Sequence, residues 1–404
     1  MKYKEIEFGR TDIEVIDGDR GKKYPHQNEL LNNGFCVFLS ASNVTVSGFK
    51  FDSVVYITKE KDEQLKNGKL SRNDIVITTR GTVGNVALFD SDIPFNEMRI
   101  NSGMLIIRCH EMVDYKYLYY VLRGRGFQQQ IRQIVTGSAQ PQLPKSHLLK
   151  MLIAIPPLSV QKQISSILDK IDKKIANNNR INDNLEAQLS SLFIHNFSDA
   201  VASADIGACP MLGDLITVID NRGKTPPLTT ETIDYPIIDV GALKGFGRIV
   251  DFNNCTKYVT KTTYDSWFRS GHPQPWDILI STVGSLAEIK IYLGSKGCIA
   301  QNVVALRAKS ISPLYLYQYL RFIRAGLVAY NIGSVQPSIK VTHIIKHPIF
   351  VPETSKLKEF EEVARVITNR LYTNYNECES LKKLRDTLLP KLMSGELDVS
   401  NLNL

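Results

Sequence analysis

The two halves of this 404-residue chain are diverged copies of each other. Residues 15–17, Val-Ile-Asp, recur 203 positions later at 218–220, and the Asp-Ile-Val-Ile run at 74–77 recurs at the same spacing as Asp-Ile-Leu-Ile at 277–280. A repeat of this length is too long for a solenoid and has the size of a domain. The duplication therefore predicts a protein that performs one task at two places.

The composition is that of an ordinary globular protein with a modest basic bias. Hydrophobic residues make up 43% and charged residues 22%, and 49 Lys and Arg against 41 Asp and Glu give a net charge of +8. A positive balance favours a polyanionic partner, although it discriminates weakly by itself. The six cysteines form no C-x-x-C pair, which argues against a zinc ribbon or a disulfide framework. No apolar run approaches the roughly 18–20 residues of a membrane span, so we expect a soluble, cytoplasmic protein.

Each copy opens with short strand-like segments separated by Gly, Asn and Pro. The segments are 35–39, 74–78, 86–89 and 104–107 in the first copy, and 237–240, 277–280, 288–293 and 303–306 in the second. A helix is expected next, at 115–122 and 313–322, followed by a Gly-Ser-x-Gln-Pro loop at 137–141 and 333–337. Short strands with frequent turns favour an α+β domain.

A long amphipathic segment then closes each copy, at 159–195 and 355–392. Both carry a heptad stripe, in steps of 4 and 3, that continues over about eight turns. The stripe residues that we expect to pair the two helices are Ile164, Leu168, Ile171, Ile175, Asn178, Leu185, Phe360, Ile367, Leu371, Asn374 and Leu381. The further stripe positions are Asn182, Leu189, Leu192, Ala364, Cys378, Arg385 and Leu388.

The simplest cover for each stripe is the other helix. An antiparallel pair would put the two globular copies at opposite ends, related by an approximate two-fold axis. Asn178 and Asn374 are equivalent within the stripe. They either fix register as buried amides or face water at the edge of the stripe. Gly395 is expected to end the second helix, with Pro390 disturbing its last turn.

The common catalytic motifs are missing. No phosphate-binding glycine loop of the G-x-G-x-x-G or G-x-x-x-x-G-K-[ST] type occurs. Asp277, Glu288 and Lys290 match the loose D…E-x-K pattern of metal-dependent nucleases, but the first copy has no E-x-K after Asp74. We therefore expect a chain without catalytic or metal-binding residues, with a metal-dependent nuclease as a remote alternative.

Four segments together resemble the specificity (S) subunits of type I restriction–modification systems over nearly the whole chain. Residues 74–84, Asp-Ile-Val-Ile-Thr-Thr-Arg-Gly-Thr-Val-Gly, resemble a motif of their target recognition domains, and residues 155–172 resemble the start of their central helical spacer. Residues 212–226 resemble the opening of a second recognition domain, and 388–397 the end of the family's chain. The second copy has Ser-Thr-Val-Gly at 281–284 where the first has the longer Thr-Thr-Arg-Gly-Thr-Val-Gly at 78–84, so we expect a shorter loop in the second copy.

The resemblance implies two α+β target recognition domains, 1–157 and 197–353, separated by two long antiparallel helices, which lie in a central spacer, 158–196, and in a C-terminal spacer and tail, 354–404. It implies that each domain reads one half of a bipartite double-stranded DNA target. It also implies that the helices dock methyltransferase (modification) subunits, two in number, and that restriction subunits join them. S-adenosylmethionine, ATP and Mg²⁺ are expected on those partner subunits, and no cofactor on this chain.

Candidate DNA contacts are basic or amide side chains in loops, because such groups reach phosphates and base edges. The candidates are Arg20, Lys22, Arg80, Gln140, Arg222, Lys224, Lys257, Lys261 and Gln336. For the two Arg-Gly-Lys loops the alternative is a solvated turn, and for the two glutamines it is a structural turn, which we favour. A stand-alone DNA-binding or scaffold protein with another helical partner is the rival to the specificity subunit.

Overall fold

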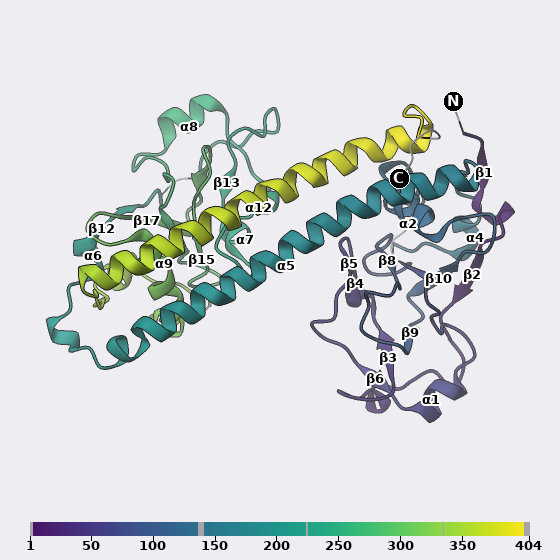
Figure 1. Cartoon of the computed structure of the whole chain (residues 1–404), viewed down its shortest axis with the longest axis horizontal. Coiled ribbons are helices and arrows are strands. Elements are labelled where there is room, and N and C mark those ends of the chain that lie inside the picture. Colours follow the sequence, from purple (N-terminus) through teal and green to yellow (C-terminus); the bar gives the residue numbers. More distant parts are fainter. Residues whose placement is uncertain (1–2, 136–140, 224, 334, 400–404) are drawn as a thin grey trace. The chain divides into compact units, whose positions relative to one another are not determined.

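A computed structural model describes residues 3–135, 141–223, 225–333 and 335–399. The chain divides into two compact units: unit 1 is Met1–Ile175 with Ser380–Leu404, and unit 2 is Ala176–Glu379. Two long helices, α5 (Leu158–Ala202) and α12 (Thr354–Ser394), each contribute a part to both units (Figure 1). The mixed α+β class with two long helices is thus confirmed, and the division into recognition domains and spacers stays a prediction.

The described residues in the globular part of unit 1 form four small sheets and several short helices. Its elements are β1 (Glu5–Glu7), β2 (Glu14–Asp17), β3 (Cys36–Leu39), β4 (Val44–Thr45), β5 (Gly48–Phe49), β6 (Tyr56–Ile57), α1 (Lys59–Gln64), β7 (Ile75–Thr78), β8 (Val86–Leu88), β9 (Met98–Ile100), β10 (Met104–Arg108), α2 (Tyr115–Arg123), α3 (Arg125–Val135), α4 (Lys145–Leu148) and β11 (Leu152–Ala154). Strands β2, β10, β7 and β8 form an antiparallel sheet in that order, and β6, β3 and β9 form a second one in which β3 and β9 are parallel.

Unit 2 repeats this plan. Its elements are α6 (Leu212–Leu215), β12 (Ile216–Ile219), β13 (Ile237–Ile238), α7 (Val240–Leu243), α8 (Lys261–Trp267), β14 (Ile278–Ser281), β15 (Ile289–Ile291), β16 (Cys298–Ile299), β17 (Val303–Ala308), α9 (Pro313–Phe322), α10 (Arg324–Val328) and α11 (Val341–Ile345). The sheet order β12-β17-β14-β15 matches β2-β10-β7-β8, and the parallel pair β13–β16 matches β3–β9. Val240, expected to end a strand, instead begins α7, because the Asp239 carboxylate accepts from the Gly241 N–H and caps a helical turn.

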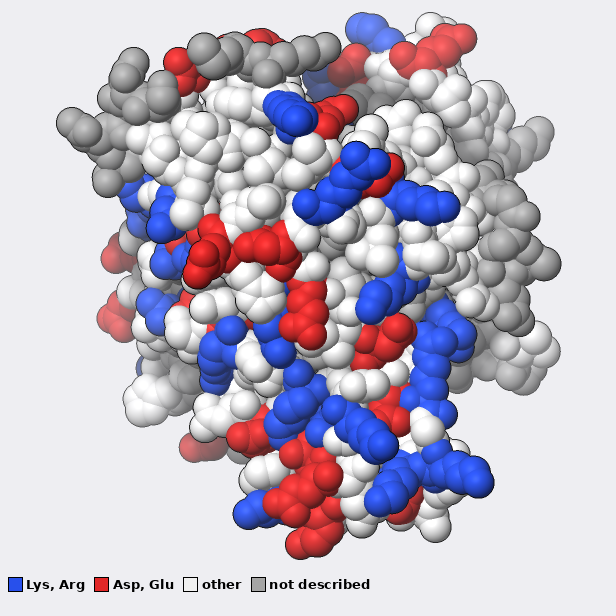
Figure 2. Space-filling model, turned by 90° about the vertical axis from the view of Figure 1, so that its right-hand side faces the viewer, with Lys and Arg blue, Asp and Glu red and all other residues white. Residues whose placement is uncertain are grey.

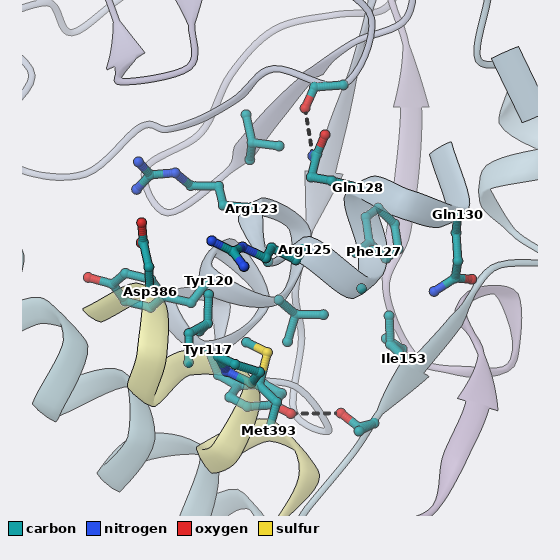
Figure 3. A pocket seen from close by; sticks show the side chains of 18 of the residues that line it. Tyr117, Tyr120, Arg123, Arg125, Phe127, Gln128, Gln130, Ile153, Asp386 and Met393 are labelled. Atoms are coloured by element: carbon teal, nitrogen blue, oxygen red, sulfur yellow. Dashed lines mark hydrogen bonds between the residues drawn. The ribbon is translucent and has the colours of Figure 1, made fainter. Parts of the chain in front are cut away.

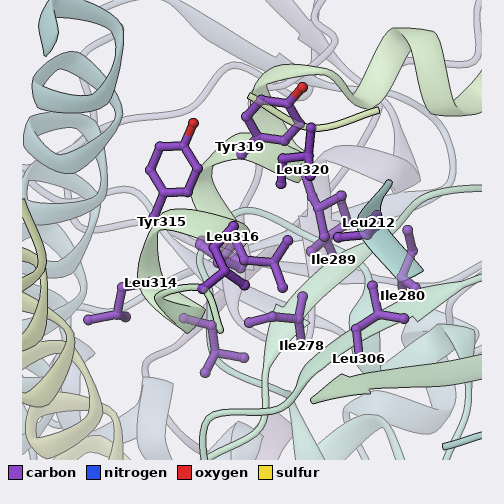
Figure 4. Close-up of a cluster of buried hydrophobic side chains, with 14 of the residues drawn as sticks. Leu212, Ile278, Ile280, Ile289, Leu306, Leu314, Tyr315, Leu316, Tyr319 and Leu320 are labelled. Atoms are coloured by element: carbon purple, nitrogen blue, oxygen red, sulfur yellow. The ribbon is translucent and has the colours of Figure 1, made fainter. Parts of the chain in front are cut away.

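The four-stranded sheet of each unit is buried on both faces. In unit 2, Ile278, Ile280 and Leu306 pack on α9 and the long helices (Figure 4), whereas Leu279 and Ala305 pack on the opposite side, against α7 and β16. Unit 1 divides its residues between two clusters in the same way. Successive side chains of a strand point to opposite faces of the sheet. Because nearly all positions of these short strands are apolar, both faces are covered by other elements, and the sheet is the middle one of three layers.

The repeated aspartate ahead of β7 and β14 has a structural role. Asp74 accepts from the Arg108 guanidinium at 2.7 Å, and Asp277 accepts from Arg307 at 2.8 Å. Each aspartate is almost fully buried and follows a non-glycine residue with positive φ, Asn73 or Trp276. This motif therefore joins the start of one strand to the end of its neighbour.

The long helices pair in antiparallel fashion inside each unit. In unit 2, Asn178 Nδ2 donates to Glu377 at 2.7 Å, and Asn374 Nδ2 donates to Asn182 at 2.8 Å. In unit 1, Arg385 of α12 donates to Asp172 of α5 at 2.7 Å. Asn178 and Asn374 are fully buried, so the alternative in which they face water is wrong.

The buried stripe departs from a strict heptad near the end of α5. Leu185 and Leu192 are only partly buried, whereas Glu186, Leu189, Phe193 and Phe197 are buried. On a helix of 3.6 residues per turn each step of four moves the buried side by about 40°, so it turns away from the heptad stripe towards the globular core. The helix consequently continues to Ala202 rather than ending near 195.

The other expected pairing residues fall into two groups. Ile164, Leu168, Ile175, Phe360 and Leu371 are buried, and Ile171, Ile367 and Leu381 are partly buried. Pro390 lies within α12, which ends at Ser394 ahead of Gly395 with φ +72°. Left-handed glycine is the usual conformation just past a helix end. Among the described residues, no helix has both the length and the apolarity needed to cross a membrane.

A fully buried arginine fixes the globular part of unit 2 to both long helices. Arg248 donates to Glu186 of α5 through its backbone N–H at 2.7 Å, through Nε at 2.9 Å and through Nη2 at 3.0 Å. Its Nη1 donates to Thr368 of α12 at 2.9 Å. The Arg321 guanidinium reaches the same carboxylate at 3.4 Å.

Candidate nucleic-acid interface

Loops from distant parts of the sequence meet at one edge of the four-stranded sheet of unit 1. In an antiparallel sheet the ends of β2 and β7 lie beside the start of β10. Thr79 N and Arg80 N donate to the Gly103 carbonyl at 2.8 and 3.3 Å, and Leu143 N donates to the Thr79 carbonyl at 3.0 Å. We call residues 17–22, 79–85, 101–103 and 141–143 the loop edge of unit 1.

Unit 2 has the same arrangement. Thr282 N donates to the Asn302 carbonyl at 2.8 Å, and Ile339 N donates to the Thr282 carbonyl at 2.8 Å. Gly284 N donates to the Pro337 carbonyl at 3.0 Å. Residues 220–223, 225, 282–288, 300–302, 332–333 and 335–339 form the loop edge of unit 2.

The loops that follow β7 and β14 have the same backbone structure. Asn85 N donates to Thr78 Oγ1 at 3.0 Å, and Glu288 N donates to Ser281 Oγ at 2.9 Å. Gly81 and Gly284 both have left-handed φ, +73° and +84°. The expectation that the second loop is shorter is therefore wrong.

Because the loops are equally long, Arg80 corresponds to Val283 at a shift of 203. Both residues make a backbone bridge to the segment after the Gly-Ser-x-Gln-Pro motif, to Gln142 and to Ser338 respectively. Arg80 is exposed, so its side chain is free to contact a ligand. The two edges thus share a backbone and differ in the side chain they present at this position.

Two of the candidate arginines are held by an aspartate of the same loop. Arg20 donates to Asp17 at 3.1 Å, and Arg222 donates to Asp220 through Nε and Nη2 at 2.9 and 2.5 Å. Burial raises the pKa of the Asp220 carboxyl, but the Arg222 guanidinium and its backbone N–H outweigh this and lower the pKa overall. The side chains remain 54% and 41% exposed, so each arginine is oriented yet accessible.

The remaining candidates are distributed less evenly. Lys22 and Gln336 are exposed at the loop edges of unit 1 and unit 2. Gln140 and Lys224 lie outside the described residues. Lys257 and Lys261 are exposed on and before α8, where Lys261 pairs with Asp265 at 2.7 Å, and they are not part of the loop edge.

Gln301 is a loop-edge residue that sequence reasoning missed. Its Nε2 donates to Thr225 Oγ1 at 3.2 Å and contacts the Gly223 carbonyl at 3.5 Å, so the amide lies against the Arg222 loop. The equivalent residue in unit 1 is Ser102, because Val303 and Met104 occupy the same place opposite Ser281 and Thr78. Sequence periodicity could not signal this pair, since the offset there is 199 rather than 203.

Acidic and basic side chains alternate on the face of unit 1 shown in Figure 2, and Lys and Arg gather towards its lower part, at the level of α1 and β6. No continuous basic surface covers this face. On this face the charges therefore form local groups rather than one uniform field.

Each of the three residues in the nuclease-like D…E-x-K pattern forms an ion pair or hydrogen bond with another group of the protein. Asp277 pairs with Arg307 at 2.8 Å, Glu288 pairs with Arg324 at 2.9 Å, and Lys290 Nζ donates to the carbonyls of Gly245 and Gly247 at 2.9 and 2.5 Å. Within the part of the chain that the structure describes, no cluster of three His, Cys, Asp or Glu residues is spaced to hold a metal ion.

Comparison with known proteins finds similarity in sequence and in fold. Residues 11–187 match the family model described as the type I restriction modification DNA specificity domain. The chain is 25% identical over 352 residues to the type I restriction enzyme MjaIX specificity subunit of Methanocaldococcus jannaschii, covering 82% of this chain and 79% of that protein. It is 21% identical over 360 residues to the MjaVIII specificity subunit of the same organism, covering 83% and 81%.

A solved structure shares the fold. The crystal structure of the type I restriction–modification system S subunit from M. genitalium aligns with a TM-score of 0.57 and 17% identity, over 97% of this chain and 96% of that one. Residues 11–187 thus match a type I restriction modification DNA specificity domain, and over more than four fifths of its length the chain is similar to type I restriction enzyme specificity subunits.

Proposed function

We propose that this chain reads a bipartite double-stranded DNA target, with one loop edge for each half-site. The observation that carries the proposal is the recurrence of the loop edge: the backbone hydrogen bonds of Thr79 and Leu143 recur at Thr282 and Ile339, while Arg80 is replaced by Val283 and Ser102 by Gln301. A shared backbone with different side chains is what two readers of different sequences need, because side chains at base edges carry the specificity.

The loop edges suit this role chemically. A guanidinium such as that of Arg80 binds guanine O6 and N7 or a phosphate, and an amide such as that of Gln301 pairs with adenine N6 and N7. Arg20 and Arg222 recur in both units, which favours contacts to phosphates common to every sequence.

Methyltransferase subunits, two in number, dock on the helical spacers in this proposal, and restriction subunits join them. Exposed Val363 and Val366 on α12, 46% and 71% accessible, support a protein partner for that helix. The chemistry then belongs to the partners, in keeping with the engaged Asp277, Glu288 and Lys290.

The test is to co-express the chain with the neighbouring methyltransferase in a host without methylation and to map the methylated adenines. We expect a complex that co-purifies and a motif of two defined half-sites with an undefined gap, with half-site centres roughly one helical turn, about 10 bp, apart. A continuous motif, or methylation that persists without this chain, would contradict the proposal.

Arg80→Ala should change or relax one half-site only, at a cost of about 1–3 kcal/mol for the lost base contact. Arg72→Ala is the matched control, because Arg72 donates to the carbonyls of Asp90 and Phe95 outside the loop edge. If both half-sites weaken equally, Arg80 contacts phosphate rather than a base.

A further inference from the structure

A surface groove of about 630 Å³ lies in unit 1 between α2, α3 and the last turns of α12 (Figure 3). Its walls include the apolar side chains of Phe127, Ile153, Leu389 and Met393. All of its lining residues belong to unit 1 and none belongs to the loop edge's candidate arginines. Gly84 and Asn85 of the loop edge reach one end of the groove, but its apolar walls lie outside the loop edge.

The internal repeat supplies a second copy of this region for comparison. Helix α2 corresponds to α9 at a shift of 198: Tyr117 donates to the Ala154 carbonyl and Tyr315 donates to the Phe350 carbonyl, both at 2.8 Å. The end of α12 corresponds to the end of α5 at a shift of 196, which relates Leu389 to Phe193.

In unit 2 the corresponding space contains aromatic rings. Phe193 lies 5.7 Å from Phe322 and 5.5 Å from Tyr315 between ring centroids, and Phe197 lies 5.2 Å from Tyr315. Both Phe193 and Phe197 are at most 2% exposed.

In unit 1 the three phenylalanines are replaced by smaller or more flexible residues. Leu389 stands for Phe193, Met393 for Phe197 and Gly124 for Phe322. The Gly124 position faces Leu389, since a Cβ there would lie 3.5 Å from a Leu389 methyl group. The groove thus lies where unit 2 has three further rings, and unit 1 has no aromatic residue at those three positions.

The rim of the groove is basic. Four arginines line it, against two carboxylates, Glu5 and Asp386. Arg123 and Arg385 are engaged by Asp172 at 3.7 and 2.7 Å. Arg125 is exposed and makes no hydrogen bond or ion pair within the described residues, so a positive charge next to the apolar walls is left for a ligand.

We propose that this groove binds a segment of a partner protein that inserts an aromatic side chain and presents a carboxylate to Arg125. The volume accommodates more than one side chain, and the rings that fill the equivalent space in unit 2 come from polypeptide. Duplex DNA keeps its base faces stacked inside the helix and presents a charged backbone, so it offers the apolar walls no matching surface. The site distinguishes unit 1 from unit 2 and is independent of which DNA sequence is read.

The test uses a random peptide library displayed on phage and panned on the full-length protein, with the Leu389→Phe variant as the counter-target. This substitution restores the ring of unit 2 and closes the groove. Leu384→Phe is the matched control, since Leu384 is an exposed leucine of α12 that does not line the groove. Thermal unfolding should show both variants folded, with the midpoint of Leu389→Phe unchanged or raised by about 2–4 °C.

We expect enrichment of peptides that combine Phe, Tyr or Trp with Asp or Glu. A synthetic peptide of the enriched sequence should bind Leu389→Phe at least about tenfold more weakly, a difference of about 1.4 kcal/mol, and Leu384→Phe normally. Arg125→Gln should weaken acidic peptides more than their amide analogues. The proposal is wrong if nothing is enriched, if enriched peptides bind Leu389→Phe equally well, or if duplex DNA displaces them.

Discussion

At the scale of single residues, the charges that hold this protein together are separate from those available to ligands. Arg248 and Glu186 are fully buried and satisfied, whereas Arg80, Lys22 and Arg125 are exposed. A buried ion pair adds little net stability against an apolar replacement, but breaking it leaves an uncompensated charge. Removing a buried partner should therefore be costly, and changing an exposed one should alter function only.

Glu186→Gln is expected to destabilise unit 2 by about 3–5 kcal/mol, because Arg248 and Arg321 lose their common carboxylate. Chemical denaturation, with amide hydrogen exchange of unit 2 as the probe, measures the loss in free energy of unfolding. Asp183→Asn, an exposed position of α5 one turn away, is the control and should stay within about 0.5 kcal/mol of the wild type. Equal effects of the two substitutions would show that the buried pair is not the anchor.

Lys290 should make stability depend on alkaline pH. Burial lowers the pKa of its ammonium to about 8, and the nearby charge of Arg321 lowers it further. The carboxylates of Glu186, Glu288 and Asp251 act in the opposite direction and raise the pKa, but they do not outweigh burial. The unfolded chain then binds more protons than the folded one between pH 8 and about 10.5, so this group makes stability rise with pH across that window.

Lys290→Met removes this contribution, so the stability difference between the variant and the wild type should change between pH 8 and 10.5. Buried tyrosines and cysteines titrate in both proteins and cancel in the difference. Unfolding midpoints at pH 7.5, 9 and 10 provide the measurement, and a difference that is constant with pH would refute the lowered pKa.

At the scale of elements, the long helices are held by a polar centre between apolar ends. Asn178 and Asn374 are fully buried, and each has an amide oxygen without a hydrogen-bond partner within the described residues. Such amides reduce stability while favouring one register over its alternatives.

Asn178→Leu with Asn374→Leu should raise the free energy of unfolding by about 1–3 kcal/mol and loosen the register. Register can be measured with Asn179→Cys, because Cys378 Sγ lies 3.8 Å from Asn179 Oδ1 and would face the new thiol. The disulfide should form readily with the native asparagines and less completely with the double leucine change. Undiminished crosslinking would mean that the apolar stripe alone sets the register.

At the scale of the whole molecule, the repeat separates what is common from what is specific. Both units share the sheet order, the buried aspartate–arginine pair and the loop-edge hydrogen bonds. They differ at 80 and 283, at 102 and 301, and at the groove of unit 1.

Lengthening both helices by one heptad, after Ile175 and after Glu379, should widen the gap in the DNA target without changing either half-site. Seven residues add about 10 Å of helix, which corresponds to about three base pairs. Methylation mapping gives the gap directly. Insertion into α5 alone is the control and should abolish activity, since the paired residues would no longer face each other.

The sequence by itself determined the duplication, the α+β class, the long helices and the family, because each leaves a pattern of local residues or spacing. Local periodicity could not place Phe193 and Phe197 in the core instead of Leu192, because the shape of the globular part decides which side of a helix is covered. Nor could it align Arg80 with Val283 or bring Gln301 to the Arg222 loop, since the offset between copies changes along the chain. Those relations depend on strand register and loop closure, which only the tertiary structure fixes.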